Sequence, residues 1–477
     1  MSGGRYDAVV VGAGPNGLAA AITIARAGRS VVLIEAEPTI GGGVRSAELT
    51  LPGFVHDVCS AIHPLARGSP FFAQLRLERH GLRWIEPPIG LGHPLDDGSV
   101  GLVTRDVAET AARMGTDADA YRRLMEPLAR AWPELSLDVL APFHIPWQPR
   151  RAIRLARFGL LAIQPSTRLA RRFEGEVARA VLAGCGAHSF LRLNQVLSGA
   201  FALTMLMTAH AVGWPLAEGG SGRLAEALAA ELTALGGEIV TGRPVRSMAD
   251  LPQHRVALFD VTPRQLLAIA GDRLGGGYAR RLRGYRYGPG VFKLDLALDG
   301  PIPWRNPELA RAGTVHLGGR LEEIAAGEAA VQAGRVPQRP FVLVAQSSMF
   351  DPSRAPEGKH TVWAYCHVPN GSPVDMTETI IAQIERFAPG VRDRILARSS
   401  MSPAQLEAHN ANCVGGDING GIQDLGQLFT RPAIRLDPYS TPDPAIFLCS
   451  SSTPPGGGAH GMCGHLAARS ALRRLPA

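Results

Sequence analysis

The N-terminal part of the chain contains short apolar runs that predict a β-α-β unit. Residues 6–11 form a mostly apolar run of the kind found in buried strands, and residues 17–27 form an alanine-rich stretch that favours a helix. A second apolar run, residues 30–34, precedes an acidic residue. This order is typical of the unit from which parallel sheets are built.

Later segments predict a second lobe with an antiparallel sheet. Apolar and polar positions alternate at residues 290–298 and 341–348, and a similar segment covers residues 361–368. Further helices are predicted at 107–135 and 219–235, further strands at 238–240, 255–262 and 445–449, and a last helix at the C-terminus. The chain is therefore expected to leave its first lobe and return to it at least twice.

Residues 196–213 are nearly free of charge, and their length reaches the lower edge of what a membrane-spanning helix needs. Polar residues interrupt the stretch at Ser198, Thr204, Thr208 and His210. We therefore expect a buried helix that lines an apolar cavity rather than a transmembrane helix.

Composition indicates a large globular protein. The 477 residues are 45% hydrophobic and 19% charged, which implies two or three lobes and excludes a disordered, fibrous or polytopic membrane protein. Residues 1–5 lead directly into the first strand, which leaves no room for a signal peptide. The six cysteines show no CxxC spacing. We expect a reduced, cytoplasmic protein with neither a metal site nor a redox-active cysteine pair.

The basic residues are almost all arginines. The formal net charge is +7, and of the 49 basic residues only Lys293 and Lys359 are lysines. Seven arginines and no acidic residue lie within residues 150–172, interleaved with apolar residues. This segment has two main interpretations: a solvated helix face, or a patch at the membrane periphery through which a lipid-soluble substrate enters. Nucleic-acid binding is disfavoured, because no aromatic stacking platform accompanies the arginines.

Three glycines between the first strand and the first helix predict a dinucleotide-binding turn. Gly12 permits a tight turn, Gly14 lets the backbone approach a pyrophosphate, and Gly17 allows the helix and strand to pack closely. The helix N-terminus would then neutralise the phosphates. Glu35, at the end of the second strand, is placed to bind the hydroxyls of an adenosine ribose and would repel a 2′-phosphate.

A second glycine cluster indicates FAD rather than NAD. Residues 41–43 are all glycine, and Arg45 follows them. An NAD dehydrogenase needs no second cluster at this place, whereas an extended FAD has a diphosphate, a ribityl chain and a ring to hold in line.

Several motifs spread over the whole chain resemble one family of flavoproteins. The two glycine clusters and the stretch 452–462 resemble the glutathione-reductase-like FAD superfamily, and specifically its phytoene-desaturase-like branch. Within that branch, the closest resemblance is to the group called pyridine nucleotide-disulfide oxidoreductase domain-containing protein 2. The segments that carry this closer resemblance are 57–64, 288–293, 301–304, 346–356, 415–421 and 452–458.

The resemblance implies an α/β fold class: a glutathione-reductase-like, FAD-binding Rossmann fold and a second α+β substrate domain with an antiparallel sheet and a helical subregion. The implied segments are FAD-binding parts at 1–100, 216–275 and 431–477, a helical substrate region at 101–215 and the substrate sheet at 276–430. The cofactor contacts that the motifs and the resemblance imply are Gly12, Gly14, Pro15, Asn16, Gly17, Glu35, Ala36, Gly42, Gly43, Arg45, Ser60, Ala61, Val245, Thr262, Gly458, Gly461 and Met462.

Three residues beside these motifs are candidates for moving a proton: His63, His460 and Asp417, with Asn419 in the same loop as Asp417. Each has a structural alternative. Isolated histidines are often hydrogen-bonded structural groups, and an aspartate between glycines often caps a turn.

The branch acts on elongated apolar molecules, so the resemblance implies an FAD-dependent dehydrogenase, desaturase or oxidase that takes a hydride from an apolar substrate to flavin N5. Oxygen or a quinone would accept the electrons, and the sequence leaves a homodimer open. Two alternatives remain: a redox-neutral flavin-dependent isomerase, and a flavin-bound regulatory or scaffold protein.

Overall fold

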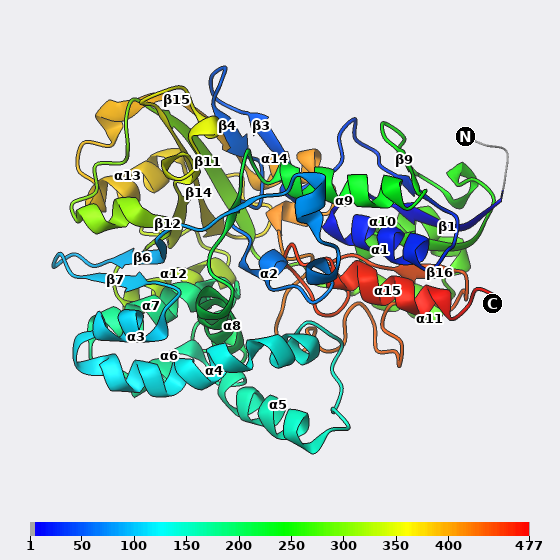
Figure 1. Ribbon diagram of the computed structural model, residues 1–477, viewed down its shortest axis with the longest axis horizontal. Helices are drawn as coiled ribbons and strands as arrows, with labels where there is room; N and C mark the ends of the chain where they lie inside the picture. The colour runs from blue at the N-terminus through cyan, green and yellow to red at the C-terminus, as the bar shows by residue number, and fades with distance from the viewer. Residues whose placement is uncertain (1–4, 477) are drawn as a thin grey trace.

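The computed structural model describes residues 5–476 of the chain and places two sheets side by side (Figure 1). The smaller sheet and its helices lie at the right of Figure 1, where the chain both begins and ends. The larger sheet lies at the upper left, and a group of helices lies below it. Residues 1–4, part of the N-terminal segment discussed above, and residue 477 are outside the described range.

The smaller sheet is parallel throughout and contains strands from three separate parts of the chain. Its strands, in spatial order, are β16 (Ile446–Leu448), β10 (His254–Phe259), β1 (Tyr6–Val11), β2 (Val31–Ile34) and β9 (Glu238–Val240). The expected β-α-β unit is therefore present, with α1 (Pro15–Arg26) as its crossover helix.

Both faces of this sheet are buried, as the continuous apolar runs require. Alternate residues of a strand point to opposite faces, so Ala8 and Val10 join one core while Val9 and Val11 join another. Helix α1 packs against α9 (Gly222–Ala234) and α15 (Met462–Leu472) on the first face. Helices α10 (Pro263–Ala270) and α11 (Gly276–Arg283) cover the second face.

The larger sheet is mixed, and all its pairings are antiparallel except the one between β6 and β12. Its strands, in spatial order, are β15 (Ile395–Met401), β11 (Gly290–Leu298), β14 (His360–Val368), β13 (Val342–Ala345), β12 (Ala312–Leu317), β6 (Ile89–Pro94) and β7 (Val100–Val103). A parallel Rossmann sheet beside a mostly antiparallel second sheet confirms the expected fold class.

Alternate residues of the larger sheet point to opposite faces: one face packs against α13 (Thr377–Phe387) in a separate core, and the other face points toward the first lobe. Phe292 and Leu294 of β11 pack with Ile380 and Ile384 of α13. Trp363 and Tyr365 of β14 point to the other face, toward the first lobe.

Strands β6 and β7 correct the expected segment boundary at residue 100. Both belong to the larger sheet, because β6 pairs with β12. The segment 1–100 therefore supplies strands to both sheets. The two-stranded sheets β3–β4 and β5–β8 connect the lobes; their strands are Ser46–Glu48, Val55–Asp57, Trp84–Ile85 and Leu216–Ala217.

The helical region lies between residues 107 and 211, with α12 (Leu321–Gln332) packed against it. Its helices are α3 (Val107–Ala112), α4 (Ala118–Val139), α5 (Pro149–Ala162), α6 (Ser166–Leu169), α7 (Glu176–Ala187) and α8 (Ser198–Ala211). Helix α8 is the charge-free stretch expected to be buried, and it is buried over most of its length. Among the described residues, no helix is both long enough and apolar enough to cross a membrane.

Candidate functional site

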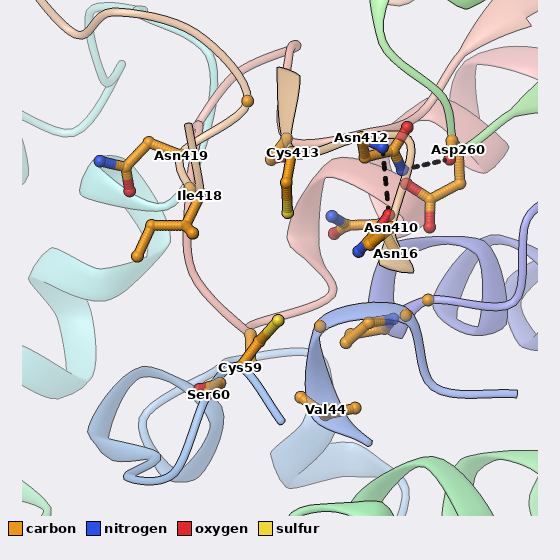
Figure 2. Close-up of a pocket in the computed structure, with 18 of the residues that line it drawn as sticks. Asn16, Val44, Cys59, Ser60, Asp260, Asn410, Asn412, Cys413, Ile418 and Asn419 are labelled. Carbon is orange, nitrogen blue, oxygen red and sulfur yellow. Dashed lines mark hydrogen bonds between the residues drawn. The ribbon is translucent and has the colours of Figure 1, made fainter. Parts of the chain in front are cut away.

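A single cavity of about 680 Å³ extends from the turn between β1 and α1 to the inward face of the larger sheet. At the first end it is lined by the two glycine clusters and by the ends of β2 and β10. At the other end it is lined by α8 and by side chains of β11 to β14. Figure 2 shows part of the cavity, where residues 59–60 face two segments that are distant from them in sequence, residues 410–413 and 418–419.

The glycine turn has the geometry that each glycine was expected to provide. Gly12 has a φ of +98°, in the left-handed region that favours glycine. A Cβ on Gly17 would lie 1.8 Å from the carbonyl oxygen of Gly12, so only glycine permits this packing of α1 on β1. A Cβ on Gly42 would lie 3.1 Å from the Cα of Gly14, so the two glycine clusters touch.

Glu35 and Arg45 lie together beside this turn. Glu35 is buried, and its carboxylate accepts hydrogen bonds from the backbone N–H of Ala13 (2.7 Å) and of Glu37 (3.0 Å). The guanidinium of Arg45 is 3.7 Å from Glu35. The Nε of Arg45 and the Oδ1 of Asn16 are buried and have no hydrogen-bond partner among the described residues. The unpaired Nε–H of Arg45 fits an anionic group, and the unpaired oxygen of Asn16 at the start of α1 fits a ligand that also donates hydrogen bonds.

Asp260 is a buried acid at this site that the sequence analysis missed. It follows β10 directly, and its Oδ2 accepts a hydrogen bond from the backbone N–H of Gly17 (2.9 Å). Burial, together with the nearby charge of Glu35, raises the pKa of Asp260 to about 7, although the hydrogen bond from Gly17 opposes the shift. The helix N-terminus therefore meets a carboxyl group that is easily protonated.

Most of the residues expected to contact the cofactor line the cavity. These are Gly12, Gly14, Pro15, Asn16, Glu35, Ala36, Gly42, Gly43, Arg45, Ser60, Ala61, Val245 and Gly458. Four others do not contribute to its wall: Gly17, Thr262, Gly461 and Met462.

Several of the expected residues that do not line the cavity lie at the start of a helix and fix where that helix begins. Thr262 forms a capping box with Gln265 at the start of α10. Gly461 is the N-cap of α15 and has a φ of +67°. A Cβ on Gly464 would lie 1.7 Å from the carbonyl oxygen of Asn16, so the C-terminal motif brings α15 against the beginning of α1.

His63 lies on the cavity wall with one ring nitrogen available. Its Nε2 is 2.8 Å from the hydroxyl of Ser221, and that hydroxyl donates its proton to the carbonyl of Ser60 (2.6 Å). His63 must therefore donate from Nε2, which leaves Nδ1 as an acceptor without a partner among the described residues. Burial lowers the pKa of His63 to about 4, so the ring is neutral near pH 7.

The hydrogen bonds of Asp417 favour the structural alternative. Asp417 lines the cavity, but its Oδ2 accepts from the backbone N–H of Gly288 (2.7 Å) and of Gly421 (2.8 Å), and its Oδ1 accepts from that of Asn419 (2.7 Å). Burial raises the pKa of Asp417. Its carboxylate holds a glycine-rich loop in place rather than facing a reactant.

The contacts of His460 also favour the structural alternative. It is buried and does not contribute to the cavity wall. Its Nδ1 accepts the backbone N–H of Met462 (3.0 Å) at the start of α15, and burial lowers its pKa to about 4. The ring therefore caps a helix N-terminus.

The larger sheet contributes a titratable group that the sequence analysis did not single out. Lys293 of β11 lines the cavity, is buried and forms an ion pair with Asp295. Burial raises the pKa of Asp295 to about 6, and His56 lies 3.5 Å from its Oδ1. In the sheet register Lys293 is opposite Tyr365, and Asp295 is opposite Trp363. The sequence does not show which face of β11 points into the cavity, so these residues could be placed there only once the topology of the sheet was known.

The loop after α14 (Pro403–His409) forms another part of the wall that had no recognised motif. Asn412 donates a hydrogen bond from its side chain to the carbonyl of Asp260 (2.9 Å) and accepts one from the backbone N–H of Thr262 (3.1 Å). In Figure 2 the neighbouring Cys413 faces Cys59 across the cavity wall. The fold thus brings together two free cysteines that have no motif spacing in the sequence.

Comparison with known proteins supports the nucleotide-binding interpretation of the first end of the cavity. The profile of the NAD(P)-binding Rossmann-like domain matches residues 10–75. That segment contains the end of β1, the whole of α1 and β2, both glycine clusters and the loop that carries Cys59 and Ser60.

Similarity to individual proteins extends over nearly the whole chain. The chain is 27% identical to pyridine nucleotide-disulfide oxidoreductase domain-containing protein 2 of Rattus norvegicus over 552 aligned positions, which cover 99% of this chain and 94% of that protein. The fold matches an oxidoreductase from Methanosarcina mazei (TM-score 0.64, 16% identity, 98% and 99% coverage). It also matches cyclohexylamine oxidase from Brevibacterium oxydans (TM-score 0.59, 14% identity, 98% of each chain).

The resemblance expected from the motifs is confirmed: this chain is similar over almost its whole length to pyridine nucleotide-disulfide oxidoreductase domain-containing protein 2, and it has a dinucleotide-binding Rossmann domain within the fold of the FAD-dependent oxidases.

Proposed function

We propose that this chain binds FAD and oxidises an apolar substrate that donates a hydride to flavin N5. The observation that carries this proposal is the continuity of the cavity, which joins a dinucleotide turn to an apolar chamber without a break. When bound, FAD would supply an isoalloxazine ring that accepts two electrons. Gly14, Gly42 and Arg45 would hold its diphosphate, and Glu35 its adenosine ribose.

The chamber favours an apolar substrate because its walls are mainly aliphatic and aromatic. Phe201 and Met205 come from α8, Leu343 from β13, and Trp363 and Tyr365 from β14. The two aromatic rings are nearly perpendicular, with centroids 5.1 Å apart. Lys293 is the charged side chain that the described strands of the larger sheet contribute to this wall. A cationic substrate would therefore meet a like charge, and a neutral or anionic one would not.

Two groups of the chain are placed for proton transfer: one can accept the proton that the substrate loses with the hydride, and the other can donate a proton to a reacting group. His63 offers an unprotonated Nδ1 because its Nε2 is committed to Ser221. Lys293 offers ammonium protons held in place by Asp295. Both side chains are buried, so these groups would act with little contact with bulk solvent.

An anaerobic bleaching screen tests the proposed function. FAD-loaded protein is mixed without oxygen with apolar polyenes, alcohols and amines, and the flavin absorbance is followed. We expect bleaching by an apolar alkene or alcohol, with a product lighter by two hydrogens. A product of unchanged mass would instead identify an isomerase. If no compound bleaches the flavin, the regulatory or scaffold alternative is favoured.

Two variants separate binding from chemistry in the same assay. Lys293→Met and His63→Phe should each retain FAD but slow bleaching at least tenfold, since a well-placed proton-transfer group typically contributes a factor of about 10²–10⁴. Asp417→Asn is the comparison, because its contacts are structural. It should lower stability while leaving the bleaching rate of the folded fraction unchanged.

We further infer that the surface around α5 rests on an anionic lipid membrane. Trp147 is fully exposed, and Phe143 and Ile145 are 74% and 77% exposed. Arg150 and Arg157 are exposed beside them on α5. A tryptophan with aliphatic residues and arginines suits a membrane interface. Helix α5 packs on α8, which lines the cavity, so a lipid-soluble substrate would have a short path inward.

Vesicle sedimentation tests this surface. The protein should sediment with vesicles that contain phosphatidylserine and not with pure phosphatidylcholine, and the double variant Ile145→Ser, Trp147→Ser should stay in solution. Equal sedimentation of the variant and the wild type would contradict membrane docking at this surface. A concentration-dependent dimer that the variant abolishes would instead assign the surface to a second copy of the chain.

A further inference from the structure

Cys59 and Cys413 are separated by most of the chain but share one wall of the cavity. Cys59 lies between β4 and α2 (Pro64–Arg67), and Cys413 lies in the loop after α14. Both line the cavity, and Figure 2 shows their sulfur atoms pointing toward each other. The two side chains are close enough that each thiol shifts the pKa of the other.

Ordered backbone holds both cysteines. The residues on either side of Cys59 are tied to the second glycine cluster, since the N–H of Val58 bonds to Arg45 (2.8 Å) and that of Ser60 bonds to Gly43 (2.9 Å). The N–H of Cys413 bonds to the carbonyl of Asn410 (2.8 Å). The thiols therefore face each other because of the fold and not because of a flexible loop.

The surroundings of the pair favour a thiolate at Cys59. The neighbouring thiol of Cys413 lowers the pKa of Cys59, and the positive charges of Lys293 and Arg45 lower it further, while burial and Asp295 oppose them. The thiol of Cys59 and burial raise the pKa of Cys413. Cys59 is thus the better nucleophile, and Cys413 is the thiol that would react second.

The other four cysteines differ from this pair. Cys185, Cys366, Cys449 and Cys463 are all buried, and burial raises the pKa of each thiol. None of them lines the cavity among the described residues. Buried thiols of raised pKa are inert toward oxidants, so they serve as internal controls.

We propose that Cys59 and Cys413 form a redox-active dithiol that a low-molecular-weight disulfide converts to a disulfide bond on the wall of the cavity. This activity goes beyond the proposed oxidation and does not depend on it. The bond would connect the segment after β4 to the loop after α14, which lie on facing parts of the wall (Figure 2).

The reaction consists of two thiol–disulfide exchanges. Cys59 loses its proton, and its thiolate attacks one sulfur of the external disulfide, which forms a mixed disulfide and releases one thiolate. Cys413 then loses its proton and attacks the Cys59 sulfur, which forms the internal bond and releases the second thiolate. The two released thiolates take up the two protons. Two cysteine thiols are oxidised, and one external disulfide is reduced to two thiols.

Peptide mapping of the full-length protein tests the pair. Reduced protein is incubated with oxidised 2-mercaptoethanol, a small neutral disulfide, then denatured and alkylated, digested and analysed by mass spectrometry. We expect a cross-linked peptide joining Cys59 to Cys413 in most chains, reversed by dithiothreitol, with the other four cysteines alkylated. Recovery of both Cys59 and Cys413 in alkylated form would overturn the proposal.

Single variants test the order of attack. In Cys413→Ser the second exchange is blocked, so Cys59 should accumulate the mixed disulfide with 2-mercaptoethanol. In Cys59→Ser, Cys413 should stay alkylatable. The opposite pattern, with the mixed disulfide on Cys413, would overturn the assignment of Cys59 as nucleophile. The wild-type map needs no variant, so the proposal is tested even if a substitution prevents folding.

Discussion

Asp260 links the stability of the nucleotide turn to pH, and Asp260→Asn isolates its effect. In the folded chain burial raises the pKa of this carboxyl from 3.8 to about 7. Between these two values the unfolded chain has lost the proton and the folded chain still holds it. The unfolded state therefore binds fewer protons, and stability falls as pH rises.

The magnitude follows from the size of the shift. A difference of about three pKa units corresponds to about 4 kcal/mol when the carboxyl is ionised in both states, and part of this penalty is already present at about pH 5. Between about pH 5 and about pH 8 the wild-type protein should lose about 3 kcal/mol relative to Asp260→Asn. The amide keeps an oxygen for the N–H of Gly17 but does not ionise.

Urea unfolding of the cofactor-free wild type and variant over this pH range measures the difference. The free energy of unfolding of the variant should exceed that of the wild type by a margin that widens as pH rises and levels off above the folded pKa. A margin independent of pH would refute the reasoning, because it would mean that Asp260 is ionised at the same pH in both states.

Three further changes separate the structural parts of the account. Gly464→Ala puts a Cβ against the Asn16 carbonyl and should lower the free energy of unfolding in urea by about 3 kcal/mol. The control Gly277→Ala has open space around its Cβ and should leave the free energy of unfolding unchanged. Arg354→Met leaves the buried Asp57 carboxylate without the guanidinium 2.6 Å away and should lower the free energy of unfolding by about 3–5 kcal/mol. As a control, Lys359→Met at the exposed ion pair with Asp299 should change the free energy of unfolding by less than about 1 kcal/mol. His460→Ala should lower stability by about 1–2 kcal/mol but leave the bleaching rate unchanged, and a loss of rate in folded protein would restore its catalytic role.

The nucleotide turn was predictable from the sequence because its determinants are local. Gly12, Gly14 and Gly17 lie within six residues between β1 and α1, and the tightest contact, that of Gly17 with the carbonyl oxygen of Gly12, falls inside this turn. The close approach of Gly12 and Gly14 to Asp260 was not predictable in this way, because Asp260 is distant in sequence. The antiparallel sheet was also predictable in part, since β11 and β14 are long and regular. Local patterns of this kind survive in the folded chain without information on distant segments.

The segment β6 was not recognised because its sequence does not alternate like a strand. It contains Gly90 and Gly92, and a Cβ on Gly92 would lie 2.5 Å from Leu309. The glycines are there to let a distant segment pack closely, which no local pattern reveals. Its parallel pairing with β12 likewise depends on the whole topology.

The site chemistry was less predictable than the fold because it depends on side-chain direction. The C-terminal motif placed His460 beside the expected flavin site, yet its ring turns to the N-terminus of α15. Lys293 reaches the cavity only because β11 alternates between two faces. The Cys59–Cys413 pair requires two loops from opposite ends of the chain to meet.

The central claim is that the cavity binds FAD. Absorbance spectroscopy of the purified protein, followed by titration of cofactor-free protein with FAD and separately with NAD, tests it most directly. We predict a yellow protein with flavin bands, or uptake of one FAD per chain with an altered flavin spectrum, and weaker binding of NAD. A colourless protein that takes up no FAD, or one that binds NAD in preference, would contradict the account.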